Sequence, residues 1–245
     1  MGRVASLFVP LVPKRAVVPI LQGPARGIRW LVGSGMPNFW LGTYEREKYE
    51  AFSRELKPGM VVYDIGANVG IYTVLACRAV GPNGSVFSFE PATMNVFYLI
   101  QNVRLNEFRN CQVIPKAVSN AVGMMGFELT QESCLGKIDP NGLLHVPATS
   151  LDSFCHAGNN PAPQLIKIDV EGEEYAVLRG GVRILLEAGP IIFLATHGKK
   201  IHADCRRFLE ELGYSLEYLA PDEIIAKKRA KAPHPNGAMA CPSPS

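Results

Sequence analysis

Two polar features that lie close together in this sequence have residue types suited to binding a cofactor. The first is a glycine-rich turn, Asp64-Ile65-Gly66-Ala67-Asn68-Val69-Gly70, and the second is Glu90. Glycine lets the backbone approach a ligand closely. An acid at the end of a following strand can accept hydrogen bonds from both hydroxyls of a ribose. The pair therefore predicts a site for an adenosine-containing cofactor.

The residues around these features follow the order strand, turn, helix, turn, strand. The apolar run Met60–Tyr63 precedes the glycine turn, an apolar helical segment follows it, and the strand Ser85–Phe89 ends at Glu90. This order is typical of the nucleotide half-site of an open α/β sheet. An ordinary glycine-rich junction between a strand and a helix is the alternative, but the acid after the second strand favours a cofactor site.

Asn68 distinguishes this turn from the dinucleotide fingerprint GxGxxG. That fingerprint brings a pyrophosphate onto a helix N-terminus and needs a second glycine where this chain has Asn68. An amide side chain suits the carboxylate and amine of an amino acid better than a diphosphate. S-adenosylmethionine has both groups and also a ribose for Glu90, so the turn favours this cofactor over a nicotinamide dinucleotide.

Apolar strands and amphipathic helices continue to alternate after Glu90. Further strands are expected at Cys111–Val118, Leu165–Asp169, Ile191–Thr196, Tyr214–Leu219 and Glu223–Ala226. Further helices are expected at Tyr44–Leu56, from Thr93, at Glu173–Glu187 and before Gly213. The alternation predicts an α/β fold with a mainly parallel sheet, helices on both of its faces, and an antiparallel hairpin at one edge.

The length and composition indicate one globular domain with an extension at each end. The chain has 245 residues, 47% hydrophobic and 19% charged, which suffices for a continuous core. We expect an irregular arm over residues 1–42, the α/β domain over 43–228, and a disordered tail over 229–245, rich in Pro, Ala and Ser. The stretch 119–163 shows little helical periodicity and two short strand-like runs, Gly126–Leu129 and Leu144–Val146. Loops this long are often functional.

The charge and cysteine patterns argue against several classes of protein. The formal charge is only +3 and no dense Lys/Arg run occurs, so no nucleic-acid partner is expected. The six cysteines include no CxxC pair, which argues against a zinc or redox motif and favours reduced thiols in a cytoplasm. Prolines interrupt the apolar segment 6–21, so no stable membrane insertion is expected.

Four stretches together resemble the FkbM-type S-adenosylmethionine-dependent methyltransferases. They are Leu41–Glu45, Asp64–Gly70, Phe89–Pro91 with Asn95, and Leu165–Gly172 followed by Leu178-Arg179-Gly180. The resemblance covers roughly residues 40–226. It implies the class I methyltransferase fold, a three-layer Rossmann-like sandwich with a seven-stranded sheet. It also implies methylation of a hydroxyl on a small molecule or sugar.

The resemblance also implies which residues bind the cofactor. The set consists of Asp64, Gly66, Ala67, Asn68 and Gly70 around the methionine part, Glu90 at the ribose, Asn95 beside the adenosine, Ala117 and Val118 near the adenine, and Asp169. Two positions depart from the family pattern, because Ala92 replaces a frequent Asn and Ala195 a frequent Glu. The second departure leaves fewer acids around the acceptor and keeps the acid–base assignment open.

Two residues at the carboxyl ends of later strands are the candidates for catalysis. Asp169 ends its strand and His197 directly follows the next one. Open sheets place their sites at these ends, and an alcohol acceptor must lose a proton. Each residue also has a structural alternative, a helix-capping acid for Asp169 and a loop histidine for His197. Lys167, on the same strand face as Asp169, is expected to form a structural ion pair.

Three further points complete the expectations from sequence. The remaining histidines show no ligand spacing, so no metal site is expected; a site built from Asp169 and a nearby acid is the unsupported alternative. A nicotinamide-dependent oxidoreductase on a similar fold is one alternative function, and the chemistry of the glycine turn argues against it. A catalytically silent cofactor-binding module is the other. Binding of NAD without binding of S-adenosylhomocysteine would favour the oxidoreductase. Absence of heat on adding S-adenosylmethionine would favour the silent module.

Overall fold

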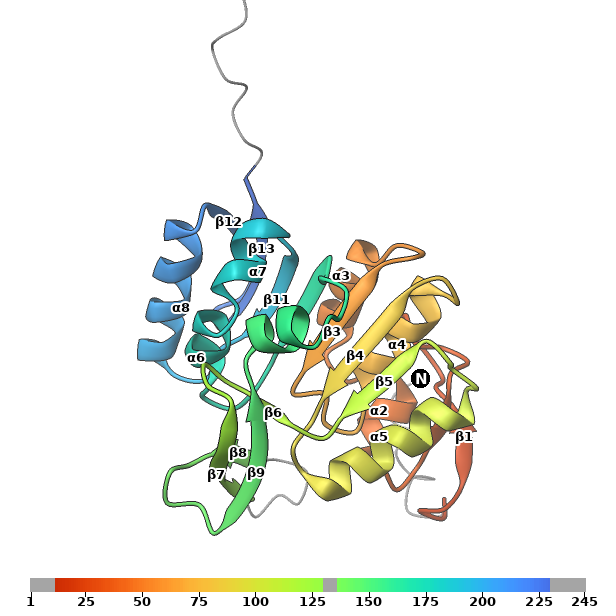
Figure 1. Cartoon of the computed structure of the whole chain (residues 1–245). Helices are drawn as coiled ribbons and strands as arrows, with labels where there is room; N and C mark the ends of the chain where they lie inside the picture. Colours follow the sequence, from red (N-terminus) through yellow and green to blue (C-terminus); the bar gives the residue numbers. More distant parts are fainter. Residues whose placement is uncertain (1–11, 130–135, 230–245) are drawn as a thin grey trace, which may run out of the picture.

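Seven strands form the main sheet in a computed structural model that describes residues 12–129 and 136–229 (Figure 1). Across the sheet they are β12 (Tyr214–Ala220), β13 (Glu223–Lys228), β11 (Ile191–Ala195), β10 (Leu165–Ile168), β3 (Val61–Ile65), β4 (Ser85–Phe89) and β5 (Cys111–Ile114). Strand β13 is antiparallel to both neighbours, whereas β11, β10, β3, β4 and β5 run parallel. The predicted mostly parallel sheet with an antiparallel edge hairpin is confirmed.

Helices cover both faces of this sheet (Figure 1). Helices α3 (Arg46–Glu55), α4 (Ile71–Val80) and α5 (Thr93–Leu105) share one core with Val62, and α6 (Glu174–Arg179), α7 (Val182–Glu187) and α8 (Lys199–Glu211) share another with Tyr63. Successive strand residues point to opposite faces, so this division confirms the three-layer sandwich. No helix in residues 12–129 and 136–229 is long and apolar enough to cross a membrane.

Two predicted elements are divided in the structure. The helix expected over Glu173–Glu187 is broken at Gly180, where a Cβ would collide with the carbonyl oxygen of Ser119. The strand expected over Cys111–Val118 ends at Ile114, because Pro115 has no backbone N–H to continue the ladder. Its last two residues form β6 (Ala117–Val118) in a second sheet.

This second sheet is the part of the fold that sequence analysis missed. It consists of β6, β9 (Leu144–Thr149), β7 (Gly123–Leu129) and β8 (Gly136–Ile138), in that order. Sequence analysis predicted only two short strand-like runs here, Gly126–Leu129 and Leu144–Val146. The sheet has its own small core around Phe127 and projects below β6 and α6 in the view of Figure 1.

The N-terminal arm, expected to be irregular, is ordered over the residues that the structure describes. Strands β1 (Val17–Pro19) and β2 (Arg29–Leu31) pair antiparallel, and a short helix α2 (Pro37–Leu41) follows. Asn102 on α5 accepts a hydrogen bond from the backbone N–H of Leu31, and Trp30 is fully buried. The arm therefore packs onto α5. The tail predicted to be disordered, 229–245, lies outside the described residues except for Arg229.

Candidate functional site

A cavity of about 310 Å³ lies at the carboxyl edge of the parallel strands. Its volume is at the lower end of the range for small-molecule sites. Most of the predicted site residues line it: Gly66, Ala67, Asn68, Glu90, Asn95, Ala117, Val118, Asp169 and His197. Two predicted residues, Asp64 and Gly70, do not line the cavity. The second sheet contributes Phe127 and Ile138 to its wall.

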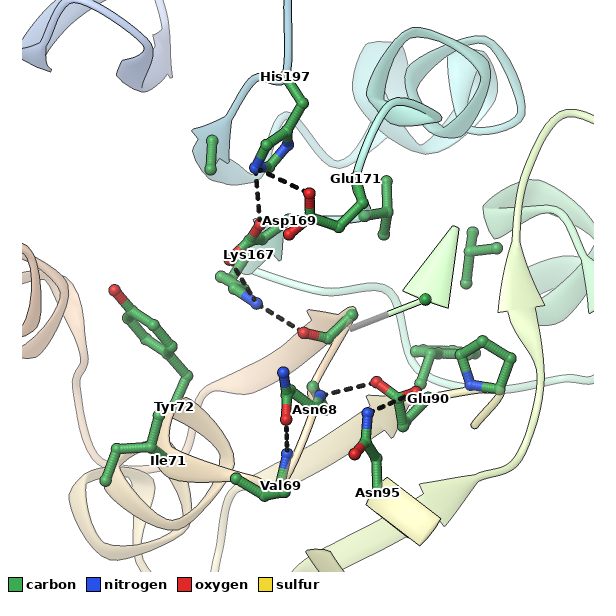
Figure 2. A pocket seen from close by; sticks show the side chains of 18 of the residues that line it. Asn68, Val69, Ile71, Tyr72, Glu90, Asn95, Lys167, Asp169, Glu171 and His197 are labelled. Carbon is green, nitrogen blue, oxygen red and sulfur yellow. Dashed lines mark hydrogen bonds and ion pairs between the residues drawn. The ribbon is translucent and has the colours of Figure 1, made fainter. Parts of the chain in front are cut away.

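The turn between β3 and α4 shapes the inner wall of the cavity (Figure 2). Gly66 has φ +73°, and a Cβ there would collide with the carbonyl oxygen of Asp169. Asn68 also has a left-handed conformation, φ +51°, and its Oδ1 accepts a hydrogen bond of 2.7 Å from the backbone N–H of Val69. The turn therefore lies tightly against the end of β10, which is why glycine is required at position 66.

Glu90, directly after β4, is fixed by three donors although only 5% of it is exposed. The backbone N–H of Asn68 donates to Oε2 at 2.8 Å, and Nδ2 of Asn95 donates to Oε1 at 3.3 Å (Figure 2). The N–H of Ala92 donates to Oε1 at 2.9 Å. Burial raises the pKa of Glu90, and these hydrogen bonds oppose that rise. A carboxylate held in this way can accept further hydrogen bonds from ligand hydroxyls in the cavity.

Asp64 lies beneath the turn and supports it from outside the cavity. It is fully buried, and its Oδ2 accepts a 2.6 Å hydrogen bond from Oγ1 of Thr73. Nζ of Lys167 lies 3.6 Å from both Asp64 Oδ1 and Asp169 Oδ2, and donates to the carbonyl oxygen of Gly66 at 2.8 Å. Burial lowers the pKa of Lys167, but the carboxylates of Asp169 and Asp64 outweigh that effect and raise it. Lys167 therefore forms the expected ion pair and ties β3 to β10.

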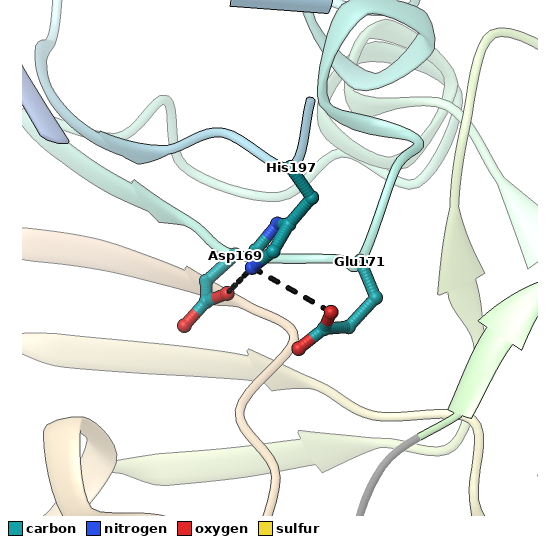
Figure 3. Close-up of side chains that lie close together, drawn as sticks. All are labelled: Asp169, Glu171 and His197. Atoms are coloured by element: carbon teal, nitrogen blue, oxygen red, sulfur yellow. Dashed lines mark ion pairs between the residues drawn. The ribbon is translucent and has the colours of Figure 1, made fainter. Parts of the chain in front are cut away.

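Asp169, Glu171 and His197 meet at the other end of the cavity (Figure 3). Nε2 of His197 lies 3.8 Å from Asp169 Oδ1 and 3.5 Å from Glu171 Oε2. Its Nδ1 lies 2.8 Å from Oε1 of Glu174. The hydrogen bond to Glu174 is the main cause that raises the pKa of His197 to about 9, with Glu171 and Asp169 adding to it and burial opposing it. His197 is thus mostly protonated at neutral pH.

The same three side chains have the composition of a metal site. Ligand atoms of Asp169, Glu171 and His197 all lie within 4.8 Å of one another. Carboxylate and imidazole groups both bind divalent metals, so this cluster can hold a cation if Nε2 of His197 loses its proton. Sequence analysis expected no metal site; it considered Asp169 with a nearby acid for such a site but did not join His197 to them.

A second group of charged residues lines the cavity and was missed by sequence analysis. Nζ of Lys48 on α3 donates to Oε1 of Glu45 at 2.8 Å and also to Oε1 of Glu223 on β13. Tyr72 of α4 and Asp222 line the same cavity. Glu45 belongs to the stretch Leu41–Glu45, one of the four that resemble the family, and this resemblance was the only sequence signal for a role of Glu45 in the site. Nothing local in the sequence placed Glu223 beside it.

Comparison of the sequence with known families gives one match that spans most of the α/β domain. The profile of the methyltransferase FkbM domain matches residues 64–216. One curated relative is the hexuronic acid methyltransferase AglP of Haloferax volcanii. It is 26% identical over 177 residues, which are 71% of this chain and 71% of that protein.

Solved structures with the same fold include two methyltransferases. Methyltransferase FkbM from Methylobacillus flagellatus KT superimposes with a TM-score of 0.55 at 19% identity, covering 78% of this chain and 52% of that one. Our chain thus spans about half the length of that protein. Precorrin-6y C5,15-methyltransferase from Geobacter metallireducens GS-15 superimposes with a TM-score of 0.50 at 16% identity, covering 76% and 90% of the two chains. At these identities the similarity concerns the fold.

Proposed function

This chain belongs to the FkbM methyltransferase family, and from that membership we propose that it methylates a hydroxyl oxygen of a sugar or a related small molecule. The cofactor prediction, S-adenosylmethionine, is confirmed by the family. One observation carries the proposal. The buried Glu90 carboxylate, fixed by three donors, lines the same cavity as Asp169 and His197. The relative named for hexuronic acid supports a sugar as the acceptor class.

The residues of the cavity fit this cofactor at its ribose end. We assign the ribose hydroxyls to Glu90, the methionine part to the turn at Gly66–Asn68, and the adenine to the wall that contains Ala117 and Val118. Asp64 and Gly70 support the turn from outside the cavity. When bound, S-adenosylmethionine supplies an electrophilic methyl group on a sulfonium sulfur. The protein contributes mainly by orienting the acceptor toward that methyl group.

An alcohol acceptor must also lose its proton, and we assign this step to a carboxylate rather than to His197. A general base must be unprotonated, whereas the raised pKa of His197, about 9, keeps its ring charged at neutral pH. Asp169 and Glu171 line the cavity on either side of the ring nitrogen. Burial raises the pKa of Glu171, which makes its carboxylate a stronger base. We therefore propose Glu171 as the base, with Asp169 beside the methyl group.

Binding and turnover separate this function from its two alternatives. Calorimetry with S-adenosylhomocysteine should give a saturable heat, whereas NADH should give none. Binding of NADH alone would instead indicate the oxidoreductase. Isotopically labelled S-adenosylmethionine, incubated with a panel of neutral sugars, hexuronic acids and cell extract, should transfer its label to one acceptor, detected by mass spectrometry. Cofactor binding with no labelled product from any source would indicate the silent module.

The cytoplasmic location also stays a prediction. Four of the described cysteines, Cys77, Cys111, Cys155 and Cys205, are free thiols, which agrees with a reducing compartment.

A further inference from the structure

Glu45, directly before α3, lines the cavity and has an unusual backbone conformation. Its φ of +41° lies in the left-handed region, although it is not a glycine. Such a conformation persists only where the surroundings impose it, and it is common at sites that bind ligands. Two donors hold the side chain. Nζ of Lys48 donates to Oε1 at 2.8 Å, and the hydroxyl of Tyr72 donates to Oε2 at 3.3 Å.

The contacts of Tyr72 place Glu45 at the acceptor end of the cavity, by which we mean the end that contains Asp169 and lies away from Glu90. The Tyr72 ring, whose hydroxyl contacts Glu45, has its centroid 5.2 Å from Nζ of Lys167. That Nζ lies 3.6 Å from Oδ2 of Asp169. Figure 2 shows Tyr72 and Glu90 on opposite sides of the β3–α4 turn. Glu45 is therefore placed to contact the acceptor rather than the ribose.

Lys48 is the cation nearest to Glu45, and it is already shared by two carboxylates. Its Nζ donates to Glu45 and also to Oε1 of Glu223, the first residue of β13. An ammonium group has three donors but only one charge. The three side chains together therefore carry a negative charge, and Lys48 is not available to pair with an anionic acceptor.

Carboxylates outnumber cations over the whole acceptor end, as far as the structure describes its wall. The acidic residues that line this end are Glu45, Asp169, Glu171, Asp222 and Glu223. The cationic side chains there are Lys48, Lys167 and His197, and each already lies against at least two carboxylates. A neutral His197 ring would only increase the excess of negative charge. Lys116 also lines the cavity, but it directly precedes Ala117 in the wall that we assign to the adenine.

Binding of the cofactor does not remove this excess. S-adenosylmethionine has a positive sulfonium, a positive amine and a negative carboxylate, so it adds one positive charge against an excess of two carboxylates. An acceptor with its own carboxylate would therefore lie among like charges, and unpaired like charges are a means by which sites reject a ligand. Hydroxyl and amino groups, in contrast, donate the hydrogen bonds that carboxylates accept.

Aromatic rings beside these carboxylates fit the ring of a sugar. Phe39, Tyr44 and Tyr72 all line the cavity, and the ring centroids of Phe39 and Tyr44 lie 4.8 Å apart. The C–H face of a sugar ring is apolar and packs against aromatic rings, while the hydroxyls at its edge reach polar groups. An apolar wall with a few directed polar groups is the usual construction of a small-molecule site.

We propose that the sugar ring that receives the methyl group is neutral or carries an amino group, and that Glu45 selects it by accepting hydrogen bonds from its hydroxyl or amino groups. A uronic acid is thereby excluded as the methylated ring. This inference rests on the proposed function and deepens it, because it names the class of acceptor. Glu45 binds the acceptor in this scheme, whereas Glu171 takes its proton.

The test compares matched acceptors with the full-length wild-type protein. The acceptors are the methyl glycosides of a hexose, its 2-amino form, its uronic acid and its uronamide, each in the gluco, galacto and manno series. Transfer of labelled methyl from S-adenosylmethionine is measured by mass spectrometry. For the sugar series that is accepted, kcat/KM should be at least about tenfold higher on the hexose and the uronamide than on the uronic acid. The uronamide has nearly the same shape as the uronic acid, so this comparison isolates charge.

Cell extract provides the natural acceptor if these simple glycosides are too small. After incubation with labelled S-adenosylmethionine, the products are hydrolysed with acid and the labelled monosaccharide is identified by mass spectrometry. A labelled hexose or amino sugar would support the proposal. A labelled uronic acid, or equal rates on the uronic acid and the uronamide, would overturn it and leave the proposed function intact. A complete absence of labelled sugar would contradict the proposed function, and this inference with it.

Variants of Glu45 test its part in the selection. In Glu45→Gln the preference for the hexose over the uronic acid should fall about tenfold, mainly through a higher KM for the hexose, because a charged hydrogen-bond acceptor is replaced by a neutral one. Its kcat and its affinity for S-adenosylhomocysteine should stay close to those of the wild type, whereas loss of a merely structural residue would lower both. Glu50→Gln, at an acid on the same helix that pairs with Arg46 and does not line the cavity, should change none of these values.

Glu45→Asp keeps the charge but shortens the side chain, so it should raise the KM for the hexose while the uronic acid remains disfavoured. This variant and the wild-type comparison decide the outcome if Glu45→Gln does not fold. An unchanged preference in folded Glu45→Gln would show that Glu45 does not select the acceptor.

Discussion

The two ends of the cavity are built in different ways. The end that we assign to the cofactor comes mostly from two neighbouring segments, the β3–α4 turn and the residues from Glu90 to Asn95, with Ala117 and Val118 added from β6, and part of it is backbone. The acceptor end brings together side chains from α3, the ends of β10 and β11, α6 and β13. Backbone geometry therefore determines the shape of the cofactor end, whereas charged side chains determine the properties of the acceptor end.

The two ends of the cavity also differ in how far their acidic and histidine side chains are exposed to solvent. Glu90 is 5% exposed, whereas the side chains of Asp169, Glu171 and His197 are 34%, 36% and 37% exposed. A nearly buried acid held by three donors is preorganised for one ligand shape. A partly exposed group of charges accepts a polar substrate at lower desolvation cost. Substitutions at the cofactor end should therefore act mainly on binding and stability, and substitutions at the acceptor end mainly on turnover.

The largest effect is expected for Gly66→Ala, because this substitution is incompatible with the backbone geometry of the cofactor end. The new Cβ would meet the carbonyl oxygen of Asp169 while φ stays near +73°. We expect the free energy of unfolding to fall by about 2–4 kcal/mol and S-adenosylhomocysteine binding to be lost. Urea denaturation and calorimetry measure the two effects.

Gly59→Ala is the matched control for this prediction. Gly59 has φ +83°, but a Cβ there meets nothing within 4 Å. That variant should show only the conformational cost of about 1–2 kcal/mol and keep its affinity for S-adenosylhomocysteine. Equal losses in the two variants would mean that the close approach of the turn to β10 does not determine the site.

The next largest effect is expected for Glu90→Ala, which tests the ribose assignment. Removing the carboxylate leaves ligand hydroxyls without partners, so binding of S-adenosylhomocysteine should weaken by about 1–3 kcal/mol, or roughly 5- to 150-fold. Calorimetry measures the dissociation constant. Glu47→Ala, at an exposed acid on α3, should leave it unchanged. An unaltered dissociation constant in Glu90→Ala would contradict the assignment.

The contrast between the two ends also explains what sequence could predict. At the cofactor end, strand periodicity, the glycines and Glu90 all lie within a short stretch, and local patterns are what sequence analysis can detect. Asp64 was the exception, because a strand-end acid has the same local signature whether it faces the cavity or lies beneath it. Its buried bond to Thr73 depends on the packing of α4 against β3.

The side chains of the acceptor end could not be predicted to lie together, because only the folded topology brings them close. Glu174 and His197 are 23 positions apart, and Lys48 and Glu223 are 175 apart, so no local pattern links them. The second sheet was missed for a related reason. Its strands are short and exposed on one face, and its parallel pairing of Ala117–Val118 with Ala148–Thr149 joins distant parts of the chain. Sequence therefore predicted the main sheet well but only part of the cavity wall.

A smaller effect, confined to turnover, is expected for His197→Ala. The substitution removes the ring that lies against Asp169 and Glu171 and holds both side chains in place, so methyl transfer should slow about tenfold, which is about 1.4 kcal/mol in the barrier. The affinity for S-adenosylhomocysteine should not change, because Glu90 and its donors are intact. Transfer of labelled methyl to the identified acceptor measures the rate. His145→Ala, an exposed histidine on β9, is the control. Unchanged turnover in His197→Ala would make His197 a structural residue only.

The smallest effect is expected in the pH dependence of stability, and it too belongs to the acceptor end. The pKa of His197 in the folded protein, about 9, lies above the ordinary value of 6.5. A raised pKa means that the folded state binds the proton more tightly. The stabilisation is therefore complete below about pH 6.5 and is lost as the pH rises through 9. Because 37% of the side chain is exposed, screening by solvent reduces the contribution to about 1 kcal/mol.

Urea unfolding of the wild type and of His197→Gln at pH 6.5 and pH 9.5 isolates this contribution, because every other titrating group is common to both proteins. The wild type should lose about 1 kcal/mol more than the variant between the two pH values. The cofactor end should contribute nothing to that difference, since Glu90 and its donors are the same in both proteins. An equal loss in both proteins would show that His197 is not held as a cation, and the charged end of the cavity would then not differ from the cofactor end in the way we describe.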